Sequence, residues 1–94
     1  MSGTPIYRSG GDVIGYVEYD TITDKYGEEI GKLSHGLIYT SGYSSRKIGS
    51  YDRNYWYDSS KRPVVEYKVG LLLGSSYSFL KTSEAGKFRD ELFR

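Results

Sequence analysis

The chain has 94 residues, with 13 Lys plus Arg against 12 Asp plus Glu and no cysteine. A charge balance this close to zero argues against binding the phosphate backbone of DNA or RNA, which normally needs a concentrated basic face. The lack of cysteine excludes a disulfide scaffold and a thiolate metal site. Eleven Tyr and twelve Gly favour a mainly β fold, because Tyr suits strands and Gly suits tight turns.

The beginning of the chain, Met1 to Pro5, has neither a basic start nor an apolar run. The absence of a signal peptide from this chain favours a cytoplasmic location. The longest aliphatic stretch, Val69 to Leu73, is interrupted by Gly70 and is far too short to span a bilayer. The sequence therefore predicts a single domain over residues 1–94 without a membrane span.

A degenerate repeat of about 16 residues organises most of the chain. An aliphatic residue followed by glycine recurs at Ile14-Gly15, Ile30-Gly31 and Ile48-Gly49. A second series of large apolar residues leads each copy, at Ile6, Ile22, Ile38 and Trp56. A single hairpin cannot bury its apolar face alone, so the repeat predicts β-hairpin units over residues 6–80 that pack against one another.

Each unit is predicted to contain a strand, a turn and a second strand. The first two units give strands over residues 5–8, 13–19, 21–23 and 29–34, and the next two give 37–40, 47–53, 55–57 and 64–68. Asp, Ser and Gly between these strands are typical of hairpin turns, because their side chains cap the turn or their backbone enters the left-handed region. The third unit is longer only in the turn Ser41 to Arg46, which leaves its strands in register.

The glycine that follows each aliphatic residue requires its own explanation, since glycine inside a strand costs stability. It marks either a bulge where the strand bends or a place where two backbones approach closely. Both explanations favour a closed or nearly closed sheet. In the fourth unit Val65 stands where glycine is expected and the next aliphatic-glycine pair is Val69-Gly70, so two alignments remain open.

The last part of the chain differs from the repeats. Gly74 to Ser76 is predicted as a turn and residues 77–80 as a short closing strand. Residues 82–93 are predicted as a helix, with Thr82 or Ser83 as its N-cap.

Three residues of this helix, Ala85, Phe88 and Leu92, share one face and are predicted to dock on the strands. The predicted fold is therefore mainly β: a small antiparallel β-hairpin barrel, or barrel-like sheet, built from pseudo-repeats and followed by one C-terminal α-helix.

The repeat resembles that of the bacterial β-flower proteins, which carry copies of an Ile-Tyr-Asp, turn, Gly, Ile-Gly unit. The resemblance is carried by Val13 to Val17, by its echoes at Glu29 to Leu33 and Lys47 to Tyr51, and by the Ile-Tyr pairs at Ile6 and Ile38. It covers roughly Ile6 to Leu73. It implies a shallow, pseudo-fourfold barrel of hairpins and transfers no functional residue. The chain departs from the pattern where Thr23 replaces Tyr and where Arg8 or Thr40 replaces Asp.

No residue pattern indicates catalysis. His35, the one histidine of the sequence, lies beside Gly36 at a unit boundary and is interpreted as a polar residue of a loop or strand end. Asp12, Asp24 and Asp58 fall in turns, where side-chain capping explains them. We therefore expect no enzymatic activity, no metal site and no cofactor.

An aromatic cluster is the best candidate for a binding site. It contains Tyr51, Tyr55, Trp56 and Tyr57, with Arg53 close by in the sequence. Aromatic faces can stack on sugars, on bases or on a protein partner. Strand alternation sends Trp56 inward and its two tyrosine neighbours outward, so a core role explains part of the cluster equally well.

These observations lead to one main hypothesis and one alternative. The main hypothesis is a binding or structural module acting through protein-protein contacts or self-association, with a protein partner or a homo-oligomer. The alternative is a small-ligand binder, which takes either a carbohydrate on the Tyr and Trp surface or an apolar molecule lined by Leu71 to Leu73 and Phe88. Nucleic-acid binding through Arg46 to Arg62 is disfavoured by the charge balance.

Overall fold

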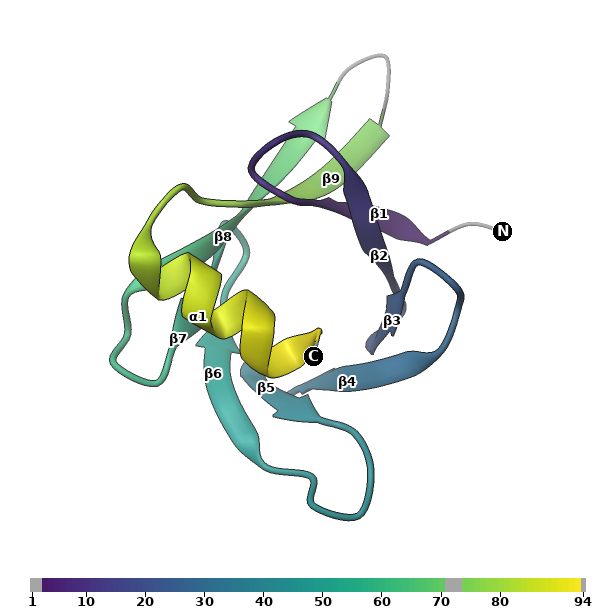
Figure 1. Cartoon of the computed structure of the whole chain (residues 1–94), viewed down its shortest axis with the longest axis vertical. Coiled ribbons are helices and arrows are strands. Elements are labelled where there is room, and N and C mark those ends of the chain that lie inside the picture. Colours follow the sequence, from purple (N-terminus) through teal and green to yellow (C-terminus); the bar gives the residue numbers. More distant parts are fainter. Residues whose placement is uncertain (1–2, 71–73, 94) are drawn as a thin grey trace.

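The computed structural model describes residues 3–70 and 74–93 of the chain. In this part, the strands follow one another in chain order around a closed barrel, and one helix follows them (Figure 1). The elements are β1 Thr4–Tyr7, β2 Val13–Glu18, β3 Thr21–Asp24, β4 Glu29–Ser34, β5 Leu37–Thr40, β6 Lys47–Tyr51, β7 Tyr55–Asp58, β8 Pro63–Gly70, β9 Gly74–Phe79 and α1 Ser83–Leu92. The predicted mainly β fold, with a hairpin barrel and one C-terminal helix, is confirmed.

The four predicted units form the hairpins β1–β2, β3–β4, β5–β6 and β7–β8, and β9 closes the barrel. Neighbouring strands pair antiparallel except at this closure, where β9 runs parallel to β1 with Tyr77 opposite Ile6. The predicted turn at Gly74 to Ser76 is wrong, because these residues begin β9. They pair with the extended end of β8, where Gly70 lies opposite Gly74. This pairing satisfies the backbone groups and outweighs the turn preference of Gly and Ser.

The sheet register shifts at the same place in every hairpin. In the first hairpin Ile6 pairs with Gly15 while Tyr7 pairs with Val13, so Ile14 is an extra residue. Equivalent shifts follow Ile22, Ile38 and Trp56. The aliphatic member of each repeated pair is therefore the extra residue of a β-bulge. Four such bulges bend and twist the strands into a closed barrel.

The pairing also resolves the alignment of the fourth unit. Trp56 pairs with Val65 as Ile6 pairs with Gly15, and the register shift follows Trp56. Val64-Val65 is therefore the fourth copy of the repeat, and the alignment with Val69-Gly70 is wrong.

Each repeated glycine directly follows a bulged residue, and three of the four hairpins have a glycine there that permits the close backbone approach expected from the sequence. A Cβ at Gly31 would lie 2.8 Å from the carbonyl oxygen of Tyr39 on the paired strand, so the backbones approach closely there. The same Cβ would lie 2.9 Å from Leu92, while one at Gly15 would lie 2.8 Å from Phe93. The glycines thus leave space inside the barrel for Leu92 of α1 and for Phe93, which follows the helix.

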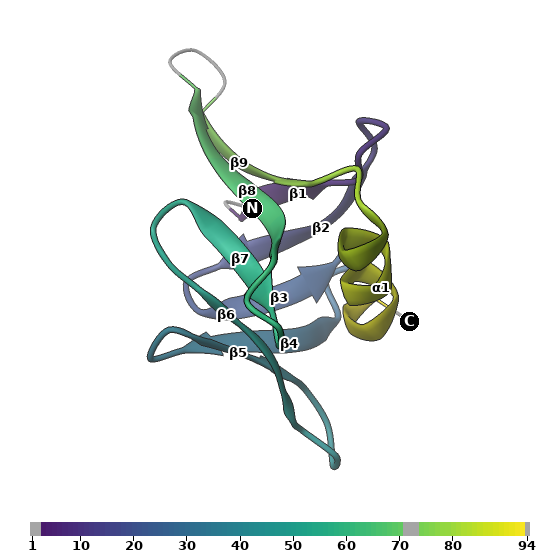
Figure 2. The same ribbon diagram turned by 90° about the vertical axis from the view of Figure 1, so that its left-hand side faces the viewer.

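Helix α1 covers one end of the barrel, and the turns that join β4 to β5 and β6 to β7 lie at the other end (Figure 2). Its predicted docking residues, Ala85, Phe88 and Leu92, are only 1%, 2% and 4% exposed and belong to the same core cluster as the strand residues. The helix begins after Thr82, whose hydroxyl accepts a hydrogen bond from the Ala85 N–H at 3.1 Å. Within residues 3–70 and 74–93, no helix has the length and apolar character required to cross a membrane.

Candidate functional site

Strand β7 divides the predicted aromatic cluster between the interior and the surface. Trp56 points inward and is 1% exposed, while Tyr55 and Tyr57 are half-buried. The two tyrosine rings lie 6.2 Å apart between centroids and are tilted by 47°. Tyr51, at the end of β6, packs against the core. The structure therefore leaves Tyr55 and Tyr57 as the surface members of the cluster.

The outer face of β7 continues onto its neighbours. Leu37 of β5, Ser50 of β6 and Tyr57 of β7 form one row across the strands. Tyr55 lies opposite Glu66 of β8. Since their neighbours Ile38 and Trp56 point inward, Leu37 and the two tyrosines lie on the outer face.

A hydrogen bond fixes one of these rings. The hydroxyl of Tyr57 donates to Oδ2 of Asp52 at 2.8 Å. Oδ1 of the same carboxylate accepts from the backbone N–H groups of Asn54 and Tyr55, at 2.8 and 2.9 Å. Arg53 lies in this β6–β7 turn with its side chain exposed. The turn thus holds the Tyr57 ring in one orientation at the surface.

The protonation states suit this arrangement. Three hydrogen bonds lower the pKa of Asp52. The largest effect comes from the Asn54 backbone N–H, followed by the Tyr55 backbone N–H and the Tyr57 hydroxyl. The hydrogen bond to Asp52 raises the pKa of Tyr57, because a phenolate would face the carboxylate. At neutral pH the carboxylate is therefore ionised and the phenol keeps the proton that it donates.

Inside the barrel, Trp56 packs against Tyr77, which in turn packs against Tyr67, and the sequence singled out neither tyrosine. The Tyr77 ring lies 5.0 Å from Trp56 and 4.9 Å from Tyr67, between centroids. Burial raises the pKa of Tyr77, with smaller contributions from Tyr67 and Tyr51. Tyr67 belongs to β8 and lies opposite Tyr77 of β9, so the pairing of these two strands brings Tyr77 to Trp56. These contacts assign Trp56 to the core.

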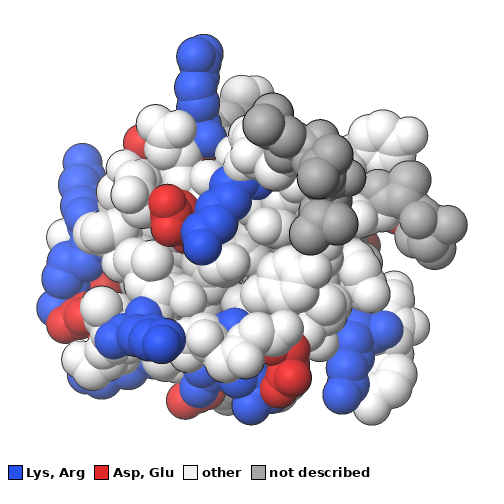
Figure 3. Space-filling model, turned by 90° about the horizontal axis from the view of Figure 1, so that it is seen from above, with Lys and Arg blue, Asp and Glu red and all other residues white. Residues whose placement is uncertain are grey.

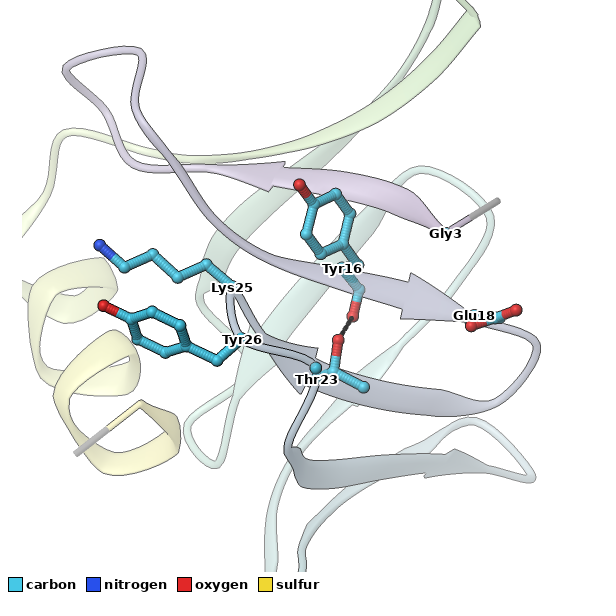
Figure 4. Close-up of a pocket in the computed structure, with 7 residues that line it drawn as sticks. Gly3, Tyr16, Glu18, Thr23, Lys25 and Tyr26 are labelled. Carbon is cyan, nitrogen blue, oxygen red and sulfur yellow. Dashed lines mark hydrogen bonds between the residues drawn. The ribbon is translucent and has the colours of Figure 1, made fainter. Parts of the chain in front are cut away.

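A groove on the outer face of β2 and β3 was not predicted. It has a volume of about 410 Å³, and Figure 4 shows the side chains at its edges. Its lining residues are Gly3, Tyr16, Glu18, Thr23, Lys25, Tyr26 and Gly27. Tyr26, at the β3–β4 turn, is 84% exposed. An aromatic residue inside a turn signature was the available signal, since capping requires only the Asp and Gly of that turn.

The remaining sequence candidates have structural places. His35 is exposed in the β4–β5 turn, with its Nδ1 3.0 Å from the Ser34 hydroxyl. Oδ1 of Asp24 accepts from two backbone N–H groups of its turn, and Oδ1 of Asp58 does the same in the equivalent turn. Among the residues that the structure describes, no group of three His, Asp or Glu side chains could hold a metal ion.

The apolar-ligand alternative depended on Leu71 to Leu73 and Phe88. The three leucines lie outside the described residues. Phe88 is 2% exposed and contacts Gly49, so it fills the core beneath α1. The described part of the barrel therefore uses this side chain for packing.

Charged side chains are dispersed on the face seen in Figure 3. Lys and Arg stand mainly around its edge, with Asp and Glu among them and an area of other residues between. Comparisons of the chain with protein-family models, with curated proteins and with solved structures each give no match.

Proposed function

We propose that this protein is a non-enzymatic binding module that works through protein contacts of the outer face of β7. The observation that carries the proposal is the pair Tyr55 and Tyr57, which share the outer face with ring centroids 6.2 Å apart. Large aromatic side chains at a surface supply most of the binding energy of many protein interfaces. Two side chains with few rotatable bonds also lose little conformational entropy on binding.

The hydrogen bond from Tyr57 to Asp52 supports the proposal, because it holds the ring in place before a partner arrives. Leu37 lies in the same cross-strand row and extends the apolar part of this face. Ser50 and Glu66 lie beside the rings and supply polar groups for hydrogen bonds at the rim. We take the partner to be a second copy of this chain or another protein with a complementary apolar patch.

Self-association is tested first, by light scattering and by NMR over a concentration series. We expect the average mass to rise with concentration and the amide signals of residues 55–57 to shift. The double substitution Tyr55→Ser/Tyr57→Ser should abolish both effects. Tyr43→Ser is the matched control, because Tyr43 is also an exposed tyrosine but lies in the β5–β6 loop.

The same variants test a different protein partner. Protein captured from an extract of the source organism by the wild type and by Tyr43→Ser, but not by the double variant, would support the proposal. A monomer at all concentrations, together with identical capture by all three chains, would exclude it. Circular dichroism confirms beforehand that the variants remain folded.

A small-ligand function is the second candidate, and the 410 Å³ groove supports its carbohydrate form. Tyr16 and Tyr26 offer aromatic faces there, and Glu18, Thr23 and Lys25 offer hydrogen-bonding groups. A glycan screen by NMR tests it. Shifts confined to these residues would support sugar binding, and no shift with any glycan would exclude it.

We also propose that the protein is related to the β-flower proteins. Four hairpins with a bulge at the same position, and an apolar-glycine pair in three of them, support this relationship. A solved β-flower structure whose bulges fell elsewhere in the hairpins would argue against it.

A further inference from the structure

A second groove, of about 310 Å³, lies between the β1–β2 turn, the β3–β4 turn and the C-terminal end of α1. Three cationic side chains line it, one from each of these segments: Arg8, Lys25 and Arg89. Its apolar lining comes from Ile14, Phe93 and the ring of Tyr26. The groove therefore combines converging positive charge with an aromatic and aliphatic wall.

Arg8 is unusual for its place in the repeat. At the equivalent position of the other hairpins, Asp24 and Asp58 cap their turns with Oδ1, and the Thr40 hydroxyl accepts from the Arg46 N–H at 3.1 Å. Arginine has no acceptor atom and cannot make these bonds. Among the described residues, no salt bridge involves the Arg8 side chain. The first hairpin thus lacks the side-chain hydrogen bonds that cap the other turns, and the described residues show no salt bridge that compensates for them, which indicates a functional site.

The connections of α1 show the same asymmetry. Glu84 pairs with Arg62 of the β7–β8 turn at 3.2 Å, and Glu91 pairs with Arg46 of the β5–β6 loop at 3.1 Å. Toward the other two hairpins, α1 presents Arg89 to a groove that already contains Arg8 and Lys25. Like charges gathered around one groove repel each other, so an anion placed between them would be stabilised.

The charged residues of the groove also indicate how many negative charges this anion carries. Two carboxylates, Asp24 and Asp90, line the groove with the three cations, which leaves one net positive charge. Oδ1 of Asp24 is occupied by two backbone N–H groups of the β3–β4 turn. Asp90 lies 3.7 Å from Arg89, and its side chain is 78% exposed, so it screens that cation only partly. A single negative charge balances such a site better than a dianion does.

We propose that this groove binds a carboxylate whose body is aromatic or aliphatic, with Arg8 and Lys25 holding the carboxylate and Tyr26 and Phe93 contacting the body. The planar guanidinium of Arg8 suits a carboxylate because it can donate two parallel hydrogen bonds. The ligand is a small organic acid or the carboxyl end of a peptide, which share this chemistry. The site lies far from β7 in strand order and does not depend on the protein contacts proposed for that strand, and it shares Lys25 and Tyr26 with the groove on β2 and β3.

The test is an NMR titration of the full chain with N-acetylphenylalanine, with its neutral amide and acetate as controls. We expect shifts of Ile14, Tyr26 and Phe93 with the acid. Removal of the charge should weaken binding by about tenfold or more, as for hydrogen bonds between charged groups. A peptide ending in Phe, compared with its C-terminal amide, separates the peptide source from the small-acid source.

Substitution of Arg8 by Asp is the most informative variant, because it should change stability and ligand affinity in opposite directions. Arg8→Asp should raise the melting temperature by restoring the turn cap and should abolish binding of N-acetylphenylalanine. Lys47→Asp makes the same change from a positive to a negative charge at an exposed position of β6 that lines neither groove, and it should leave binding unchanged. Arg8→Gln tests the loss of charge without the cap.

Several results would overturn the proposal. They are no shift with the acid, equal shifts with the acid and its amide, or unchanged affinity of a folded Arg8→Asp variant. Tighter binding of phenyl phosphate than of N-acetylphenylalanine would overturn the assignment of a single negative charge.

Discussion

Gly49 of β6 contacts the ring of Phe88 of α1, and a Cβ at this position would lie only 3.0 Å from the Phe88 Cε1 atom. The same Cβ would collide with the carbonyl oxygen of Tyr57 on the paired strand. The absence of a side chain therefore serves two contacts at once, because it lets β6 approach β7 and gives α1 its place in the barrel.

Gly49→Ala should destabilise the protein by about 1–3 kcal/mol, the usual cost of forcing an extra group into a packed core. The backbone oxygen of Tyr57 cannot move without disturbing the pairing of β6 with β7. The measurement is the free energy of unfolding from urea denaturation, followed by circular dichroism.

Gly86→Ala is the control for this substitution. Gly86 lies in α1, and an added Cβ would have no atom within 4 Å beyond its chain neighbours and the backbone of its own helix, so alanine should stabilise the helix by about 0.5–1 kcal/mol. Equal stability changes in the two variants would mean that the space at Gly49 is not needed.

Lys61→Gly should stabilise the protein by about 0.5–1 kcal/mol, because Lys61 has a φ of 64° in the left-handed region, which costs about 1–2 kcal/mol for most residues. In the equivalent β3–β4 turn this position is Gly27, with a φ of 90°. Lys61→Ala removes the side chain but keeps the strain, so it should not stabilise. Thermal denaturation of both variants decides, and a gain with alanine as large as with glycine would contradict the backbone explanation.

Sodium chloride should weaken the attachment of α1 only slightly. The salt bridges Arg62–Glu84 and Arg46–Glu91 involve exposed or partly exposed side chains, so each contributes about 0.2–1 kcal/mol at most. A double-mutant cycle with Arg46→Gln and Glu91→Gln should give a coupling energy in this range at low salt and less at 1 M salt. A larger coupling energy that survives high salt would show that the pair does more than orient the helix.

The repeat made the fold predictable because the same residues recur wherever the same geometry recurs. Ile6 and Gly15 predicted a pair of strands with either a bulge or a close backbone approach, and the docking face of α1 followed from the spacing of Ala85, Phe88 and Leu92. The closing strand was less predictable. Gly74 to Ser76 prefers turns locally, and only its pairing with β8 extends the strand.

The candidate surfaces were predictable only where one strand supplies them. Alternation along β7 separates Trp56 from Tyr55 and Tyr57, and the structure follows it. The first groove combines β2, β3 and the turn after β3, and the second combines the β1–β2 and β3–β4 turns with the end of α1. The residues of the second groove lie far apart in the sequence, so spacing along the chain contains no sign of it, whereas Tyr26 within its turn was the available signal for the first groove.

Acid should destabilise the protein below roughly pH 4. The pKa of Asp52 is lowered mainly by the hydrogen bond from the Asn54 N–H. For Asp58, burial acts to raise the pKa, but the N–H groups of Arg62 and Ser60 and the charge of Arg62 together lower it. A carboxylate with a lower pKa in the folded state stabilises the fold above its unfolded pKa of 3.8, and this contribution disappears as pH falls toward the folded pKa.

The double substitution Asp52→Asn/Asp58→Asn tests this pH dependence. Asparagine keeps an oxygen that accepts the turn hydrogen bonds but cannot titrate, so the free energy of unfolding should fall less steeply between pH 5 and about 2 than in the wild type. Urea denaturation at a series of pH values measures the slope. Asp12→Asn in the β1–β2 turn controls for the loss of a negative charge. Asp52 and Asp58 are the carboxylates that accept hydrogen bonds from the backbone N–H groups of the β6–β7 and β7–β8 turns. A double variant whose stability falls with pH as steeply as that of the wild type would therefore mean that other carboxylates control acid unfolding.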